Sequence, residues 1–384
     1  MSVTAPQGFA ASGVHCGIRK EKPDLALVRA LGSATGTAMF TANRVKAAPV
    51  VISQEHLGAA EPQAVVINSG VANAATGMRG ELDARATAAE AARLLGLQAE
   101  QVLVLSTGVI GARLPLANVL PGLATAASAL SADGGAEAAE AILTTDTQAK
   151  QSQHPCAGFS VGGMAKGSGM IHPNLATMLA VLTTDYPLEP GEAAGFLQAA
   201  VAESFNAISV DGECSTNDTV VLLANGAPDV ERDYRAFVEA LGAVCRDLAG
   251  QIVADGEGAT YVAEVEVEGA ASAAEAKAIA GRIATSPLVK TALHGRDANW
   301  GRILAAAGSA TYNGGYAQLD PARTTLTLNG VRVFAGGMPQ GAEPTLEGDR
   351  CLIELELGLG SGRATYLTTD LSHEYVSINA DYRS

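Results

Sequence analysis

Aromatic side chains are scarce in this chain of 384 residues, where they make up 4% of the sequence and include a single tryptophan. Apolar residues nevertheless reach 48%, so the core must be built from alanine, valine, leucine and isoleucine. A chain of this length can bury one large core or two ordinary ones. It contains no run of 18 or more uncharged apolar residues, so the sequence predicts no membrane span.

Cysteines and basic residues are also few. The five cysteines, which are Cys16, Cys156, Cys214, Cys245 and Cys351, are odd in number, far apart and outside any CxxC or Cys/His cluster. This pattern indicates neither a disulfide framework nor a zinc site, and it favours reduced thiols in a cytoplasmic protein. No secretion signal is predicted at the N-terminus. The net charge of −15 argues against a nucleic-acid surface or an anionic membrane face.

Strand and helix patterns alternate along the chain. Residues 25–29, 36–40, 49–52 and 64–70 are typical of strands in their β-branched and apolar content. Residues 81–97 form the clearest helical pattern, residues 233–254 a long amphipathic one, and residues 315–358 resemble β-hairpins. Because both kinds of element are mixed throughout, the sequence predicts layers of an α+β or α/β protein.

One segment stands out, Lys166-Gly-Ser-Gly-Met-Ile-His-Pro-Asn-Leu-Ala-Thr177, which runs into the apolar residues 178–182. Gly167 and Gly169 permit backbone angles closed to other residues, and Pro173 excludes a helix. Thr177 therefore lies between a glycine-rich loop and a predicted buried strand. By itself the pattern fits either an ordinary loop and strand or a chain that is cut before a hydroxyl nucleophile.

Residues 164–179 follow the pattern Met-Ala-Lys-Gly-x-Gly-Met-Ile-x-Pro-x-Leu-Ala-Thr-Met-Leu throughout. This segment resembles the self-processing site of the ornithine acetyltransferases, the glutamate N-acetyltransferase family of arginine biosynthesis. The resemblance extends from Gly8 to Ser384. It implies an α+β fold, a layered αββα sandwich with mixed sheets and a smaller C-terminal α/β part. It also implies self-cleavage between Ala176 and Thr177 into an α chain, 1–176, and a β chain, 177–384, which stay together and share the active site.

The resemblance implies catalytic roles for three residues. Thr177 is the nucleophile, and its freed α-amine, which titrates near neutrality beside the hydroxyl, is the base. Thr107 and Gly108 match the oxyanion hole, where fixed donors stabilise developing negative charge. A Ser-Thr-Gly turn is also common loop chemistry, so this assignment depends on the family.

The implied substrate-binding residues come from both halves of the chain. Lys166 matches the lysine near the substrate carboxylate, Thr144 matches a substrate-binding threonine with Thr145 as the alternative, and Glu257 matches the acid at the substrate's amino end. Asn379 and Ser384, in a C-terminal segment that matches the family ending, reach the substrate, and Thr177 also contacts it. His172 could be proposed as a general base, but an N-terminal threonine needs none. Trp300 is interpreted as structural packing.

The implied reaction moves acetyl from N-acetylornithine to glutamate through acetyl-Thr177. No metal or organic cofactor is implied, although acetyl-CoA is a co-substrate of bifunctional members, and the two chains form α2β2 or larger assemblies in the cytoplasm. Val71 and Ala75 stand where the family usually has Asn and Cys, which leaves room for a paralogue in a specialised pathway. An amidase or aminopeptidase of the same self-processing fold would also fit these residues, as would an uncleaved regulatory or binding protein.

Overall fold

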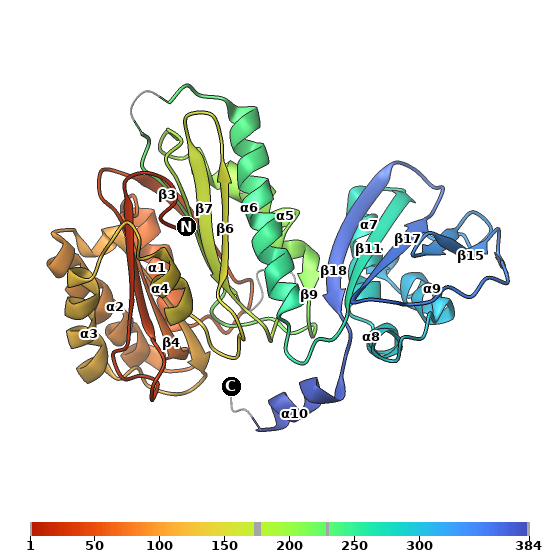
Figure 1. The fold of residues 1–384 in the computed structure, drawn as a ribbon, viewed down its shortest axis with the longest axis horizontal. Helices are drawn as coiled ribbons and strands as arrows, with labels where there is room; N and C mark the ends of the chain where they lie inside the picture. The colour runs from red at the N-terminus through yellow and green to blue at the C-terminus, as the bar shows by residue number, and fades with distance from the viewer. Residues whose placement is uncertain (1, 173–177, 228–229, 382–384) are drawn as a thin grey trace. The chain divides into compact units, whose positions relative to one another are not determined.

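The computed structural model describes residues 2–172, 178–227 and 230–381, which fold into two units (Figure 1). The first unit comprises Met1–Asn206, Glu213–Ile252 and Arg383–Ser384, and the second comprises Ala207–Gly212 and Val253–Tyr382. The chain therefore crosses between the units at residues 206–213 and again after Ile252.

The first unit contains two mixed sheets. One has the order β1 (Phe9–Val14), β2 (Leu25–Ala30), β4 (Ala64–Val71) and β5 (Val102–Val109). The other has the order β3 (Thr35–Phe40), β10 (Thr219–Ala224), β8 (Leu179–Thr184), β7 (Ser160–Lys166) and β6 (Lys150–Pro155). The pairs β4–β5 and β8–β10 are parallel, while the remaining pairs are antiparallel.

The two sheets of the first unit pack face to face. Val65 and Leu103 of the first sheet share one buried cluster with Val181 and Val221 of the second. Every one of these side chains alternates with residues that point to the outer face of its own sheet. Full burial of an aliphatic side chain of this size contributes about 1.5–3 kcal/mol, so this aliphatic layer compensates for the scarcity of aromatic residues.

Helices cover both outer faces. On the first sheet, buried residues of α2 (Gly77–Leu95) and α3 (Leu116–Ser128) pack with Val66 and Val104. On the second sheet, Gly163 of β7 leaves space for Val244 and Leu248 of α6 (Tyr234–Ala254), and α5 (Ala193–Ala202) contacts β3 and β10. Two further helices, α1 (Ala48–Ala59) and α4 (Gly135–Ala141), complete this unit (Figure 1). The predicted αββα layering is therefore confirmed.

The prediction of a strand at residues 49–52 is wrong, because these residues lie in the first turn of α1. The apolar run Pro49-Val-Val-Ile52 has strand-like composition. Proline, however, is favoured at the first positions of a helix, where its missing N–H has no intrahelical partner to lose. Val50 and Ile52 are buried, so tertiary packing outweighs the strand preference of β-branched residues.

The second unit is the smaller C-terminal α/β part that was predicted. Its main sheet has the order β16 (Met338–Pro339), β15 (Val331–Ala335), β14 (Thr325–Leu328), β17 (Arg350–Glu356), β11 (Val262–Ala270), β18 (Gly362–Thr369) and β9 (Ile208–Ser209). Side chains of α7 (Ala273–Ala284), α8 (Pro287–His294) and α9 (Trp300–Gly308) form one core with this sheet. The strands β12 (Thr311–Tyr312) and β13 (Gly315–Tyr316) form a short hairpin, and α10 (His373–Asp381) follows the last strand. Trp300 stacks on Phe334 with ring centroids 5.9 Å apart, which confirms its packing role.

A buried lysine in the second unit gives a stability prediction. Lys290 Nζ donates to the hydroxyls of Thr368 and Thr369, each at 3.1 Å. Burial lowers the pKa of Lys290 from 10.5 to about 8, against the opposing effect of the Asp211 and Asp370 carboxylates. Between these two pH values the unfolded chain binds the proton more strongly than the folded chain, so stability rises with pH.

We expect the free energy of unfolding of the wild type, minus that of Lys290→Met, to rise by on the order of 3 kcal/mol between about pH 8 and 10.5. Urea unfolding of both proteins across this range measures the difference and cancels the titration of other groups. A difference that is independent of pH would contradict a lowered pKa of Lys290.

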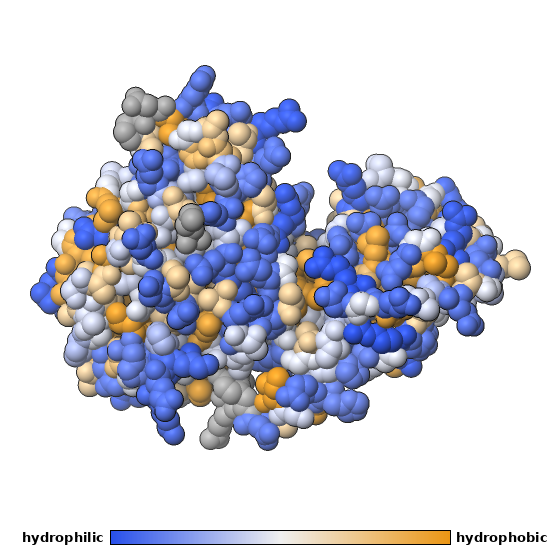
Figure 2. Space-filling model, in the orientation of Figure 1, coloured by the Kyte–Doolittle hydropathy of each residue, from blue (hydrophilic) through white to orange (hydrophobic). Residues whose placement is uncertain are grey.

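On the face drawn in Figure 2, hydrophilic residues predominate and the apolar residues are dispersed. Among the helices of the described residues, none is long and apolar enough to cross a membrane. All five cysteines are unbridged, as the sequence predicted.

Candidate active site

The predicted oxyanion residues lie where β4 and β5 end side by side. Gly108 pairs with Gly70 in the register of these strands and has φ +131°. A Cβ at position 108 would lie 2.2 Å from the carbonyl carbon of Gly70, so only glycine permits this approach of the two backbones. Thr107 is buried beside it. Thr107 and Gly108 therefore lie together at one strand end, and their role as the fixed donors of an oxyanion site stays a prediction.

A buried carboxylate joins two of the predicted substrate-binding residues. Asp146 Oδ2 accepts hydrogen bonds from the backbone N–H of Thr144 at 3.0 Å and from its hydroxyl at 3.4 Å, and it lies 3.8 Å from Lys166 Nζ. The other oxygen, Oδ1, accepts the N–H of Gly167 at 2.6 Å. The structure therefore brings Thr144 and Lys166 together, and Asp146 orients both.

A second lysine completes this cluster. Lys150 Nζ donates to Asp146 Oδ1 at 2.8 Å, and the side chains of Lys150 and Lys166 are 0% and 2% exposed. Burial raises the pKa of Asp146, but the ammonium groups of Lys166 and Lys150 outweigh this effect and hold the pKa well below its ordinary value. Two buried ammonium groups thus face the carboxylate of Asp146, and a cluster of this kind suits a substrate carboxylate.

The alternative threonine also borders this cluster. Thr145 Oγ1 lies 2.7 Å from Ser168 Oγ, in the loop that follows Lys166. Thr144 instead directs its hydroxyl toward Asp146. Both hydroxyls lie next to the segment that carries Lys166, so the choice of Thr144 over Thr145 stays a prediction.

Arg19 connects the carboxylate cluster with the predicted oxyanion residues. Its Nη1 donates to the carbonyl of Leu143 at 2.7 Å, directly before Thr144. Its Cγ lies 3.0 Å from the position that a Cβ on Gly70 would take, and Gly70 is the partner of Gly108. A single side chain thus spans the two parts of the site.

The start of β8 lies beside this cluster. Lys166 and Leu179 are partners in the β7–β8 register. Met178 N–H donates to Asp218 Oδ1 at 3.1 Å, and the N–H of Thr219 donates to the carbonyl of Met178 at 3.2 Å. Ala176 and Thr177, the predicted cleavage site and nucleophile, lie outside the described residues.

Two predicted residues of the second unit also meet. Asn379 Nδ2, on α10, donates to Glu257 Oε2 at 2.8 Å. The loop that carries Glu257 is held by Ser372 Oγ, which donates to the carbonyl of Gly258 at 2.6 Å. Gly258 has φ +64°, a conformation that favours glycine. Ser384 lies outside the described residues.

An aspartate supports this second group of residues. Asp370 accepts the backbone N–H groups of Thr260 and Tyr261 at 2.8 and 3.0 Å, and its other oxygen lies 2.7 Å from His294 Nδ1. Burial raises the pKa of Asp370, but these hydrogen bonds outweigh it, so the pKa is lowered. Asp370 therefore fixes the end of the loop 255–260 that presents Glu257.

His172 is half-buried, and its pKa is lowered by burial, with Glu213 acting in the opposite direction. A lowered pKa favours the neutral imidazole near pH 7. That His172 is not the general base stays a prediction. The described residues contain no group of three or more metal-binding side chains.

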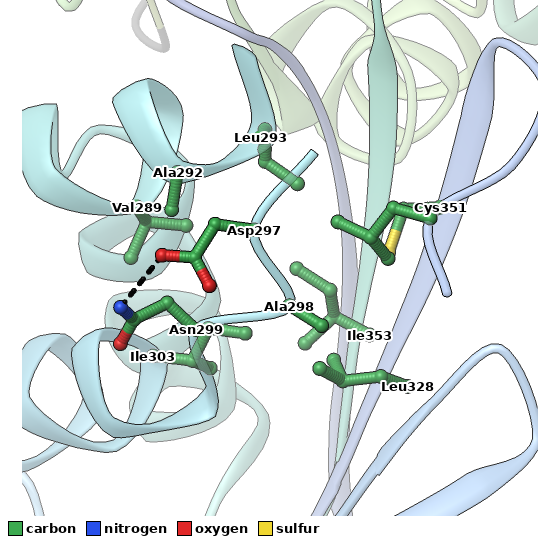
Figure 3. Close-up of a pocket in the computed structure, with 11 residues that line it drawn as sticks. Val289, Ala292, Leu293, Asp297, Ala298, Asn299, Ile303, Leu328, Cys351 and Ile353 are labelled. Carbon is green, nitrogen blue, oxygen red and sulfur yellow. Dashed lines mark hydrogen bonds between the residues drawn. The ribbon is translucent and has the colours of Figure 1, made fainter. Parts of the chain in front are cut away.

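A hollow in the second unit is too small for a substrate. Figure 3 shows it between α8, α9 and the main sheet, with the hydrogen bond of 2.9 Å from Asn299 Nδ2 to Asp297 Oδ2. Its free volume is about 10 Å³, enough for no more than a water molecule, and most of its lining is apolar. It is a packing gap in the core of this unit.

Three residues of this site were not predicted from the sequence, namely Asp146, Lys150 and Asp218. Asp146 lies in the Leu-Thr-Thr-Asp-Thr motif that contains Thr144, and the polar residues 211–218 directly precede the apolar strand β10. Charged residues such as aspartate and lysine are rarely fully buried unless they are paired. A run of polar residues next to a buried strand was therefore the available signal.

The fold and the site together define a layered αββα protein with a buried polar site, rich in hydroxyl and lysine groups, at the ends of its facing sheets. The ArgJ family model matches residues 10–384. The arginine biosynthesis bifunctional protein ArgJ of Mycolicibacterium paratuberculosis is 47% identical over 394 residues, covering 100% of this chain and 96% of that protein. The protein of the same name from Thermobifida fusca is 45% identical, with 100% of each chain covered.

The chain therefore belongs to the ArgJ family. A crystal structure of ornithine acetyltransferase complexed with ornithine, from Mycobacterium tuberculosis, is 45% identical and has a TM-score of 0.44, covering 45% of this chain and 94% of that chain. The family assignment rests on the full-length sequence matches.

Proposed function

We propose that this chain is a bifunctional acetyltransferase of arginine biosynthesis. It moves acetyl from N-acetylornithine to glutamate, and it also uses acetyl-CoA to acetylate glutamate. The observation that carries the proposal is the buried Thr144–Asp146–Lys166 cluster beside the start of β8, in a chain that matches bifunctional ArgJ proteins over its whole length. The proposed enzyme acts in the cytoplasm without a metal or organic cofactor.

Self-cleavage generates the nucleophile in this proposal. Thr177 Oγ attacks the carbonyl carbon of Ala176, the C–N bond breaks, and the hydroxyl proton passes to the released amine. Water then hydrolyses the ester, which leaves Ala176 as a carboxylate and Thr177 as a free N-terminus. The new α-amine titrates near neutrality and lies beside the hydroxyl, so it can act as the base.

Acetyl transfer then takes place in two steps. Thr177 Oγ attacks the acetyl carbonyl of N-acetylornithine, and the oxyanion is stabilised by the Thr107 hydroxyl and the Gly108 N–H. The C–N bond breaks, the ornithine nitrogen takes a proton, and acetyl-Thr177 remains. The glutamate amine attacks this ester and restores the hydroxyl. Both amino acids have an α-carboxylate for Lys166, while Glu257, Asn379 and Ser384 complete the substrate contacts.

The sheet topology supports a proposal that the two products stay together. In the order β3-β10-β8-β7-β6, the first product, 1–176, would supply β3, β7 and β6, and the second, 177–384, would supply β8 and β10. Separation would break the β3–β10 and β7–β8 pairings and expose unpaired strand edges. We propose an α2β2 or larger assembly.

The acetyl-enzyme predicts ping-pong kinetics. Initial rates measured while N-acetylornithine and glutamate are both varied should give parallel lines in double-reciprocal plots. The physical reason is that ornithine leaves before glutamate enters. Intersecting lines would contradict a covalent intermediate. With glutamate omitted, the transferase should release one ornithine per active site and then stop, whereas an amidase would continue and release acetate.

A further inference from the structure

The loop before β10 connects the two strand ends that the proposed reaction must hold together. Asn217 and Asp218 are adjacent, and only 4% and 0% of their surfaces are exposed. Their side chains reach different sheets, since Asn217 contacts the first sheet and Asp218 contacts the start of β8 in the second. Neither residue takes part in the proposed chemistry.

Asn217 is bound to the strand that carries the predicted oxyanion residues. Its Nδ2 donates to the carbonyl of Ser106 at 2.8 Å and to the carbonyl of Ala72 at 2.6 Å. Its Oδ1 accepts the hydroxyl of Thr216 at 2.6 Å. Both hydrogens of the amide are therefore used, so the side chain has one orientation, and Ser106 directly precedes Thr107.

Asp218 is bound to the residue that follows the predicted nucleophile. Its Oδ1 accepts the N–H of Met178 at 3.1 Å, and the neighbouring Thr219 donates its N–H to the carbonyl of Met178. The carbonyl of Asp218 in turn accepts the N–H of Thr41 at 2.9 Å. The N–H and the carbonyl of Met178 are thus bound by Asp218 and Thr219. Asp218 is also bound to Thr41, which directly follows β3.

We propose that Asn217 and Asp218 are positioning residues that set Thr177 against Thr107 and Gly108. The inference rests on the proposed function. It explains how the nucleophile of that function would be aligned with the oxyanion site. After cleavage, Thr177 begins a chain, and chain ends are poorly ordered unless they are tied down. The contacts of the next residue, Met178, include the hydrogen bond to Asp218.

The required feature of Asp218 is its acceptor oxygen. Burial raises the pKa of Asp218 well above its ordinary value, although the Met178 N–H, the Ser215 hydroxyl and the charge of Lys166 act in the opposite direction. Charge is therefore disfavoured at this position, and asparagine can supply the same acceptor without it. Asp218→Asn is accordingly the conservative variant, and Asp218→Ala removes the contact.

The test compares Asp218→Ala, Asp218→Asn and Asn217→Ala with the wild type. Asn225→Ala is the matched control, because Asn225 Nδ2 also donates to a backbone carbonyl, that of Gln7 at 2.6 Å, just past the opposite end of β10. Intact mass measures the cleaved fraction over time. The value of kcat is calculated per molecule whose Thr177 takes up acetyl, so misfolded protein does not lower it.

We expect Asp218→Ala and Asn217→Ala to cleave more slowly and to lower kcat by roughly 10- to 100-fold, the effect of a misplacement of about 1 Å. KM should stay within about twofold, because Lys166 is oriented by Asp146 rather than by this loop. Asp218→Asn should restore most of kcat, and the Asn225 control should match the wild type.

Wild-type kcat per acetylated site in both alanine variants would overturn the inference, as would a rise in KM alone. Equal impairment of Asp218→Asn and Asp218→Ala would also overturn it, because charge rather than the acceptor would then matter. A failure of the proposed function is recognised from the wild type alone. If the wild type is neither cut nor acetylated, both the proposed function and this inference are contradicted.

Discussion

Thr177→Ala yields a single uncut chain of 384 residues that transfers no acetyl group. The variant removes the hydroxyl that attacks Ala176 and the hydroxyl that accepts acetyl, so both activities are lost together. Loss of a catalytic nucleophile typically lowers kcat by about a millionfold. Intact mass and an assay of N-acetylglutamate formation measure the two effects on one sample.

Thr177→Ser is the control, because serine keeps a hydroxyl at the same position. It should cleave and transfer, more slowly than threonine but measurably, since a primary hydroxyl beside an α-amine is still a nucleophile. A Thr177→Ala protein that is cut after Ala176 would contradict the account, because another residue or a protease would then process the chain.

Lys166→Met lowers kcat/KM for acetyl transfer by at least about 100-fold, as expected for loss of one partner of a buried ion pair with the substrate carboxylate. The KM values for N-acetylornithine and glutamate should rise together, because both ligands present an α-carboxylate to this lysine. The fold should survive, since the variant leaves Asp146 with Lys150, a pair joined at 2.8 Å and balanced in charge.

The choice of residue matters for this experiment. Asp146→Asn would remove the carboxylate that both buried ammonium groups contact. Breaking a buried ion pair destabilises a protein strongly, so a loss of substrate binding could not be separated from a loss of folding. Lys22→Met, at an exposed lysine of the same unit, is the control for the loss of one positive charge and should behave like the wild type. A Lys166→Met protein with unchanged KM values would remove Lys166 from the substrate site.

The layered fold could be predicted because its signals are local or belong to the family pattern. The helix predicted at residues 81–97 is α2, which ends before Gly96 in a left-handed conformation with φ +69°, as a C-terminal glycine indicates. The segment at residues 49–52 shows the limit of such signals. Its β-branched residues favour a strand, but the proline at the start of α1 and the burial of Val50 and Ile52 favour the helix.

The site could be predicted only where a residue belongs to a recognised motif. Thr144 and Lys166 were predicted in this way, and the structure brings them together on Asp146. Asn217 has no local pattern of that kind, because its contacts join residues 111 and 145 positions away in sequence. Such side chain–backbone bonds exist only after the sheets have packed. The polar run at residues 211–218 could therefore signal a buried polar loop, but not the groups that Asn217 binds.

The C-terminal segment shows a different limit. Asn379 lies on α10, a helix with no buried residue among those described, so hydrophobic periodicity could not have assigned it a role. Ile378 is apolar and could be expected to anchor this segment by packing, yet it is only half-buried. The polar contacts from Asn379 to Glu257 and from Ser372 to Gly258 hold the segment instead.

The proposed mechanism requires that Thr177 become a free N-terminus and accept acetyl. An intact mass spectrum of the purified protein, recorded before and after brief exposure to N-acetylornithine, tests it most directly. We expect two chains, which result from cleavage between Ala176 and Thr177, and one acetyl group gained on the chain that begins at Thr177. A single uncut chain that gains no mass would contradict it.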